Sequence, residues 1–207
     1  MNKTGVIYGI NGPVVYLKGN TGFKMSEMVY VGKERLVGEV IALTKDTTTV
    51  QVFEETTGLK PGETVTASGD ALSVTLGPGI LNNIFDGIER PLSEIAKQSG
   101  KYISRGLTVD SLDKEKKWDV HVTVSEGEEL MGGAIIAETQ ETRSIVHKSM
   151  VPPDVNGTVI WAAKDGKYTI LDPIVKLKLE DGTEKEITLA QKWPIRIPRP
   201  THKRFPA

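Results

Sequence analysis

The sequence predicts a mainly β protein, in which two β domains are joined by a short helical connector. Glycine (21) and proline (11) are abundant beside many Val, Ile and Thr residues, which favours short strands joined by tight turns. The hydrophobic pattern also changes from short β runs to helical spacing near Gly79, and strand-like alternation returns near Asp110. A chain of 207 residues is long enough for one large or two small domains with a stable core.

Residues 1–75 are predicted to form six short strands separated by turns. Turn residues such as Asn11-Gly12-Pro13 and Pro61-Gly62 interrupt the apolar runs. The expected strands are Val6–Ile10, Val14–Leu17, Met28–Val31, Leu36–Leu43, Thr48–Phe53 and Thr64–Ala67. Six antiparallel strands can close into a small barrel that leaves no edge exposed. We therefore expect an N-terminal six-stranded antiparallel β-barrel.

Residues 76–109 have the spacing of a helical connector with one apolar face. A first helix is expected from five apolar residues at helical spacing, which are Ile80, Leu81, Ile84, Phe85 and Ile88. Pro91 can open a second short helix, and Gly100 can close it. Such a pattern, taken alone, is more typical of an ordinary packing helix.

Residues 110–190 are predicted to form a second, separate β domain. Val120, Val122 and Val124 alternate with polar residues and precede a turn at 126–128. Further strands are expected at Ala134–Ala137, Ser144–Met150, Thr158–Ala162, Tyr168–Leu171, Ile174–Leu179 and Glu186–Leu189. Three Asn-Gly or Asp-Gly pairs are hairpin candidates, since they tolerate the positive φ of tight turns: Asn156-Gly157, Asp165-Gly166 and Asp181-Gly182.

Residues 191–207 are expected to run extended, because prolines at 194, 198, 200 and 206 fix φ and remove hydrogen-bond donors. This stretch carries five Lys or Arg residues and no acidic residue. We interpret it as a connector between domains; the alternative is an anion-binding segment or a proline-motif ligand.

Charge and composition exclude several classes of partner. Lys plus Arg (26) nearly balance Asp plus Glu (27), so no overall field draws the chain to nucleic acid or to an anionic membrane. Cysteine is absent, which excludes disulfides and fits a cytoplasmic protein. No apolar run approaches the roughly 18 residues needed to span a bilayer, and the start lacks a signal-peptide core. We expect neither nucleic-acid binding nor direct membrane insertion.

Side chains suited to catalysis or metal binding are scattered. His121, His147 and His202 fall on separate predicted elements, so no metal site is expected. The carboxylates Glu54-Glu55, Glu126 and Glu128-Glu129 stand in turn-like contexts and are interpreted as solvated loop charge. The second domain looks like the flattened barrel of biotinyl or lipoyl carriers, but the sequence AAKDGKY around Lys164 and Lys167 does not resemble an acceptor motif.

A phosphate-binding loop is missing from the sequence. Such a loop needs the pattern GxxxxGK[ST], in which glycines free the backbone N–H groups for phosphate and a hydroxyl reaches the metal. The chain has three Gly-Lys pairs, each followed by a residue other than Ser or Thr: Gly32-Lys33, Gly100-Lys101 and Gly166-Lys167. No catalytic, cofactor-binding or metal-binding residue is therefore predicted.

Four separated stretches resemble one family in the family's order. They are GVIYGINGPVV, VQVFEETTGLKPGETV, LGPGILNNIFDGIERPL at Leu76–Leu92, and WPIRIPRP at Trp193–Pro200. The family is the catalytic A (alpha) subunit of V-type (archaeal and bacterial V/A-type) rotary ATPases and ATP synthases. The residues that carry the resemblance as structural signatures are Gly77, Pro78, Gly79, Phe85, Asp86, Gly87, Arg90, Pro91, Trp193, Pro194, Arg196 and Pro198.

The resemblance implies the front part of a protein that couples ATP hydrolysis or synthesis to proton or sodium transport by rotation. ATP or ADP and Mg would bind in a nucleotide domain beyond Ala207, so this chain alone is expected to be inactive. The barrel would join alternating A and B subunits into a hexameric ring as its crown, and residues 110–190 would be an outward bulge. The central stalk and stator subunits are further implied partners, and the location implied is cytoplasmic, peripheral to a membrane rotor. The alternative is a free-standing β-barrel module that binds a protein.

Overall fold

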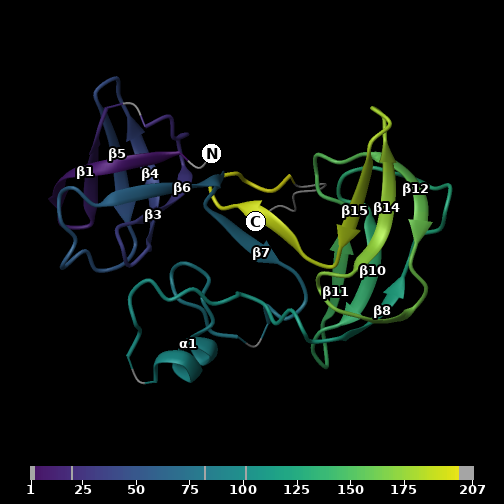
Figure 1. The fold of residues 1–207 in the computed structure, drawn as a ribbon. Helices are drawn as coiled ribbons and strands as arrows, with labels where there is room; N and C mark the ends of the chain where they lie inside the picture. The colour runs from purple at the N-terminus through teal and green to yellow at the C-terminus, as the bar shows by residue number, and fades with distance from the viewer. Residues whose placement is uncertain (1–2, 20, 82, 101, 201–207) are drawn as a thin grey trace, which may run out of the picture. The chain divides into compact units, whose positions relative to one another are not determined.

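The computed structural model describes residues 3–19, 21–81, 83–100 and 102–200, which divide into two compact units (Figure 1). Unit 1 combines Met1–Val74 with Asp86–Val109 and Pro194–Arg196. Unit 2 combines Thr75–Phe85 with Asp110–Trp193 and Ile197–Ala207. Each unit is therefore assembled from segments that lie far apart in the sequence.

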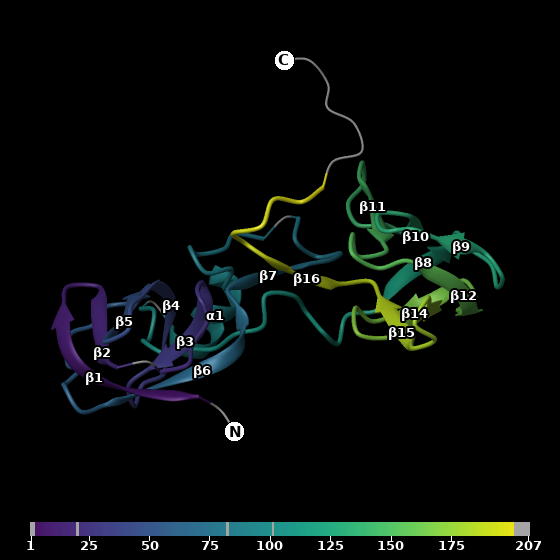
Figure 2. The same ribbon diagram turned by 90° about the horizontal axis from the view of Figure 1, so that it is seen from above.

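Unit 1 contains the predicted antiparallel barrel. Its strands are β1 (Thr4–Asn11), β2 (Val14–Lys18), β3 (Glu27–Val31), β4 (Leu36–Leu43), β5 (Thr47–Val52) and β6 (Thr64–Ala71). They close in the order β1-β2-β5-β4-β3-β6 (Figure 2). Alternate residues point inward, as in β5, where every second side chain is buried. Valines dominate the resulting core, with Val15, Val29, Val50 and Val65 fully enclosed.

The connector forms one of its two expected helices. Helix α1 (Leu92–Ser99) follows Pro91 and ends at Gly100, which has a positive φ of 72° and donates its N–H to the carbonyl of Ala96 at 3.0 Å. The helix expected around Ile80–Ile88 is absent from the described residues, so that prediction is wrong. Side-chain carboxylates bind the backbone N–H groups of Gly79, Leu81 and Ile88, and these bonds replace helical ones.

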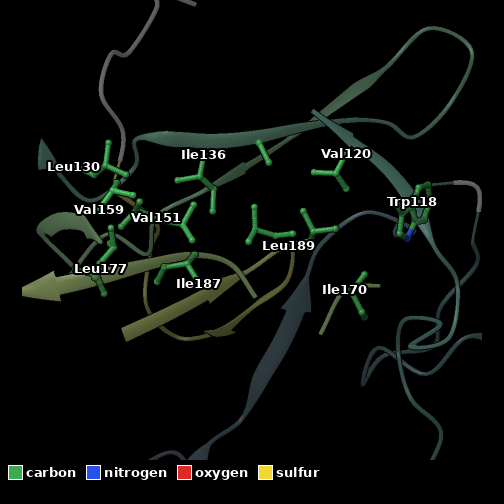
Figure 3. Packing of buried hydrophobic residues seen from close by; sticks show 14 of the residues in the cluster. Trp118, Val120, Leu130, Ile136, Val151, Val159, Ile170, Leu177, Ile187 and Leu189 are labelled. Carbon is green, nitrogen blue, oxygen red and sulfur yellow. The ribbon is translucent and has the colours of Figure 1, made fainter. Parts of the chain in front are cut away.

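Unit 2 contains two four-stranded sheets. The first has the order β11-β10-β8-β13 and the second β15-β14-β12-β9. The strands are β8 (Trp118–Val122), β9 (Glu129–Leu130), β10 (Ile135–Gln140), β11 (Val146–Met150), β12 (Gly157–Ala162), β13 (Gly166–Tyr168), β14 (Pro173–Leu179) and β15 (Glu184–Thr188). Apolar side chains of both sheets form one core, in which Val120, Ile136, Val159 and Leu177 are buried together (Figure 3). The second β domain is thus a barrel-sandwich fold.

Only one of the three hairpin candidates joins neighbouring strands. Asp181-Gly182 connects the paired strands β14 and β15, and Gly182 has a φ of 82°. The other two predictions are wrong, because the flanking strands belong to different sheets. There the polar side chains bind remote backbone: Asn156 accepts the N–H of Gly132 at 3.0 Å, and Asp165 accepts that of Val122 at 2.8 Å. Strand β13 also ends at Tyr168, three residues before the predicted Leu171, because a turn follows in which Asp172 binds the N–H of Thr169.

Strands β7 (Ser73–Leu76) and β16 (Gln191–Pro194) form a further two-stranded sheet. Over residues 192–200 the proline-rich stretch contains no helix, as predicted. The remaining residues of that stretch, 201–207, lie outside the described part, and His202 with them. No helix among the described residues is long and apolar enough to cross a bilayer.

Candidate functional site

The loop Asp86–Pro91 is organised around the carboxylate of Asp86. One oxygen accepts the N–H groups of Ile88 at 3.1 Å and Arg90 at 2.9 Å, while the other binds Nε of Arg90 at 2.8 Å. Burial raises the pKa of Asp86, but the hydrogen bonds and charge of Arg90, with the Ile88 amide, outweigh burial and lower it overall. The carboxylate therefore fixes the loop in its ionised form.

Arg90 connects this loop to the barrel within unit 1. Its Nη1 donates to the carbonyl of Leu107 at 3.0 Å and lies 3.5 Å from Oε2 of Glu54, two residues after the end of β5. The same oxygen of Glu54 accepts the N–H of Gly106 at 2.9 Å. The side chains of Arg90 and Glu54 are only 10% and 7% exposed. We call Glu54, Asp86 and Arg90 the Arg90 cluster.

The Arg90 cluster corrects one prediction. Glu54 is not solvated loop charge but a buried partner of a signature arginine, whereas its neighbour Glu55 is exposed. Glu126, Glu128 and Glu129 are exposed as predicted. Sequence reasoning missed Glu54, because its partners Arg90 and Gly106 lie 36 and 52 residues away.

The Gly77–Leu81 segment is held by a second buried carboxylate, within unit 2. Oε1 of Glu141 accepts the N–H groups of Gly79 at 2.7 Å and Leu81 at 3.0 Å. Nδ1 of His147 lies 3.4 Å from the other oxygen of Glu141, whose side chain is 4% exposed. Burial lowers the pKa of His147, and the nearby Glu141 only partly offsets this.

Glycine is required at positions 77 and 79 for two different structural reasons. A Cβ on Gly77 would lie 2.9 Å from Cβ of Ala190, so close packing requires glycine there. Gly79 has a φ of 108°, which L side chains rarely adopt. Pro78 lies between them and is part of the same turn. Of the remaining signature residues, Pro91 is buried, Phe85 is half-buried and Gly87 is exposed.

The Trp193–Pro200 segment has its own polar contacts. In unit 2, Trp193 donates its indole N–H to the carbonyl of Ile197 at 2.7 Å, and the guanidinium of Arg199 lies 4.6 Å from the Trp193 ring centre. In unit 1, Arg196 binds both oxygens of Glu39 on β4, at 2.9 and 2.6 Å. Pro194 and Pro198 flank Arg196 without helix. Arg196 and Arg199 thus both contact other residues of this chain.

Two family descriptions match the chain in succession. Residues 7–69 match "ATP synthase alpha/beta family, beta-barrel domain", and residues 109–196 match "ATPsynthase alpha/beta subunit barrel-sandwich domain". The chain belongs to the ATP synthase alpha/beta family. The Arg90 cluster draws Glu54 from the first matched range and Asp86 and Arg90 from the segment between the two ranges.

Relatives that match the chain include A subunits and alpha chains of ATP synthases. The V-type ATP synthase alpha chain of Halothermothrix orenii is 49% identical over all of this chain, and the A subunit of the A-type ATP synthase of Methanopyrus kandleri is 50% identical over 97% of it. The corresponding A subunit of Pyrococcus abyssi is 45% identical over the whole chain. The chain spans 35%, 34% and 20% of the lengths of these relatives, respectively.

The two described histidines of this family member stay apart, and each pairs with one carboxylate. His121 binds Asp165 at 2.7 Å on the surface, and His147 faces the buried Glu141. The described residues contain no group of three His, Cys, Asp or Glu that could hold a metal ion. The lysines considered as carrier acceptors are both exposed, and Lys167 lies 3.9 Å from Asp119.

Proposed function

We propose that this chain is the N-terminal region of the catalytic A subunit of a V/A-type rotary ATPase or ATP synthase, which couples ATP hydrolysis or synthesis to proton or sodium transport. The observation that carries the proposal is the match over 95–100% of this chain, at 44–50% identity, to proteins named as alpha chains of V-type or A subunits of A-type ATP synthases. These names give no support to the alternative of a free-standing protein-binding module.

The proposed contribution of this chain is mechanical. The closed barrel would join alternating A and B subunits as the crown of a ring, because a barrel without free edges and with few mobile loops is a stiff support. The Arg90 cluster would fix the connector to that support. Unit 2 would form an outward bulge that contacts stator or regulatory subunits, while the central stalk turns within the ring. Such an assembly would be cytoplasmic and peripheral to the membrane.

The first test concerns the native polypeptide. The gene product that begins with this sequence is purified, and its intact mass and tryptic peptides are measured. A mass several times 22.6 kDa, with a GxxxxGK[ST] peptide in the map, is the expected result. A native mass near 22.6 kDa without such a peptide would refute the proposal and restore the alternative of an independent binding module.

The second test concerns ATP. This chain lacks a GxxxxGK[ST] loop, so we expect no stoichiometric binding of Mg-ATP and no hydrolysis by these 207 residues. Titration calorimetry at micromolar protein measures this, with the longer native polypeptide as the positive control. Saturable, magnesium-dependent binding to the 207-residue chain itself would contradict this proposal.

The bulge is tested in the full-length protein by deleting residues 110–189. We expect ring formation to persist, since the barrel remains, and coupling or stator attachment to weaken. Unchanged coupling, unchanged stator attachment and unchanged assembly would together exclude a partner role for unit 2.

A further inference from the structure

Glu39 is a carboxylate on the outer side of the barrel that is nevertheless buried. Along β4 the side chains of Leu36 and Val40 point into the core and are fully buried. Because successive strand residues face opposite sides, Glu39 points outward. Its cross-strand neighbours Met28 and Gln51 are both partly exposed, yet Glu39 is 1% exposed. A buried carboxylate needs a partner that donates hydrogen bonds to it.

The partner is Arg196, which comes from a segment 157 residues later in the chain. Nε binds Oε1 at 2.9 Å and Nη2 binds Oε2 at 2.6 Å, so the guanidinium meets both oxygens in the two-pronged geometry specific to arginine. The side chain of Arg196 is 59% exposed, whereas that of Glu39 is 1% exposed. The backbone N–H of the adjacent Ile195 donates to the carbonyl of Leu72 at 3.0 Å, which is a second attachment of the same segment.

The two members of the pair depend on each other unequally. Without Glu39, Arg196 would return to water at little cost, since most of its side chain is already exposed. Without Arg196, Glu39 would remain a charge in a covered position with no matching donor. The geometry therefore points to a receptor on the barrel and a ligand on the segment.

We propose that Glu39 is a guanidinium receptor in the barrel wall, and that Arg196 occupies it as a releasable strap holding residues 194–196 against the barrel. Breaking the pair releases the segment while the barrel stays folded, because Glu39 lies outside the apolar core. The strap is a property of this chain and does not depend on the proposed role in a rotary enzyme.

The direct test compares trypsin cleavage after Lys192 and Arg196 in the wild-type chain and in Glu39→Gln. A glutamine cannot accept two charge-assisted bonds, so we expect cleavage at these sites to rise about tenfold or more. Glu34→Gln is the matched control, since it removes an exposed pair with Arg105, at 3.0 Å, from the same unit. Equal cleavage rates in all three proteins would overturn the strap.

Arg196→Ala separates a strap from general destabilisation. In this variant the receptor is intact but unoccupied, so millimolar methylguanidinium should slow hydrogen exchange of the Ile195 amide, which binds the carbonyl of Leu72. Methylammonium, which cannot bind both carboxylate oxygens side by side, should not slow it. Amide spectra of the barrel core report whether the barrel remains folded in each variant. If methylguanidinium gives no protection, or both cations protect equally, or the core spectrum collapses, Glu39 is not a guanidinium receptor with a releasable strap.

Discussion

Replacing Arg90 by alanine should be the most damaging single change on the connector. Arg90 is the shared donor for Asp86 and Glu54, so its removal leaves two ionised carboxylates in a poorly solvated place. Breaking a buried pair by removing one partner costs about 3–5 kcal/mol. The 3.5 Å separation from Glu54 and the 16% exposure of Asp86 reduce this, and we expect a loss of about 2–4 kcal/mol in the free energy of unfolding of unit 1.

Thermal unfolding followed by the amide NMR signals of the barrel core measures the effect. For a unit of this size the loss corresponds to a fall of at least about 8 °C in the midpoint temperature. Lys97→Ala is the matched control, because Lys97 pairs with Glu94 at 2.6 Å on an exposed face. An exposed pair contributes about 1 kcal/mol or less. If Arg90→Ala lowers the midpoint no more than Lys97→Ala does, the Arg90 cluster does not hold the connector.

Two further measurements test whether unpaired carboxylates cause the stability loss of Arg90→Ala. Combining Arg90→Ala with Glu54→Gln should cost less than Arg90→Ala alone, because the uncompensated charge at position 54 is gone while an oxygen still accepts the Gly106 amide. The pH dependence has a defined sign, since Arg90 contributes to lowering the pKa of Asp86. That contribution to stability is present above the unfolded-state pKa of 3.8 and is lost as pH falls through the folded value. The difference between wild type and Arg90→Ala should therefore shrink in acid.

Other positions give equally specific expectations. Gly77→Ala should destabilise unit 2 by about 1–3 kcal/mol, because its Cβ would press against Ala190; Gly87→Ala, with nothing within 4 Å, should change the denaturation midpoint little. In an NMR titration, His147 should titrate below 6.5, because burial lowers its pKa, and its contribution to stability is present above 6.5 and is lost as pH falls through the folded value. His121 should titrate above 6.5, because its aspartate partner raises its pKa, and its contribution is present below 6.5 and is lost as pH rises through the folded value. If His121 titrated below 6.5, its pair with Asp165 would not form in solution; if His147 titrated above 6.5, burial would not be the dominant influence on that ring.

Most of the strands could be predicted from local patterns, because each strand packs one apolar face on a core and so shows alternating apolar and polar residues. The alternation in Thr48–Phe53 anticipates β5 to within one residue at each end, and Leu36–Leu43 matches β4. Prediction failed at Ile80–Ile88, where the apolar spacing suits a helix but side-chain carboxylates bind the backbone instead. It failed likewise at Asn156-Gly157, where a side chain binds Gly132 instead of closing a hairpin. For Leu81 and for Asn156 the deciding partner is distant in sequence.

The difference between local patterns and partners distant in sequence also explains which site residues could be found from the sequence. Asp86, Arg90 and Arg196 stand in recognisable motifs, whereas their partners Glu54 and Glu39 lie in ordinary strand and turn contexts. A glutamate on the polar row of an amphipathic strand has the same pattern whether it is solvated or buried and paired with an arginine. Burial is decided by what the rest of the chain places on that row. Each motif arginine and its barrel carboxylate therefore act together, and a substitution of one should be interpreted through its effect on the other. Replacing Arg196 matters chiefly because it leaves the buried Glu39 carboxylate without its guanidinium partner.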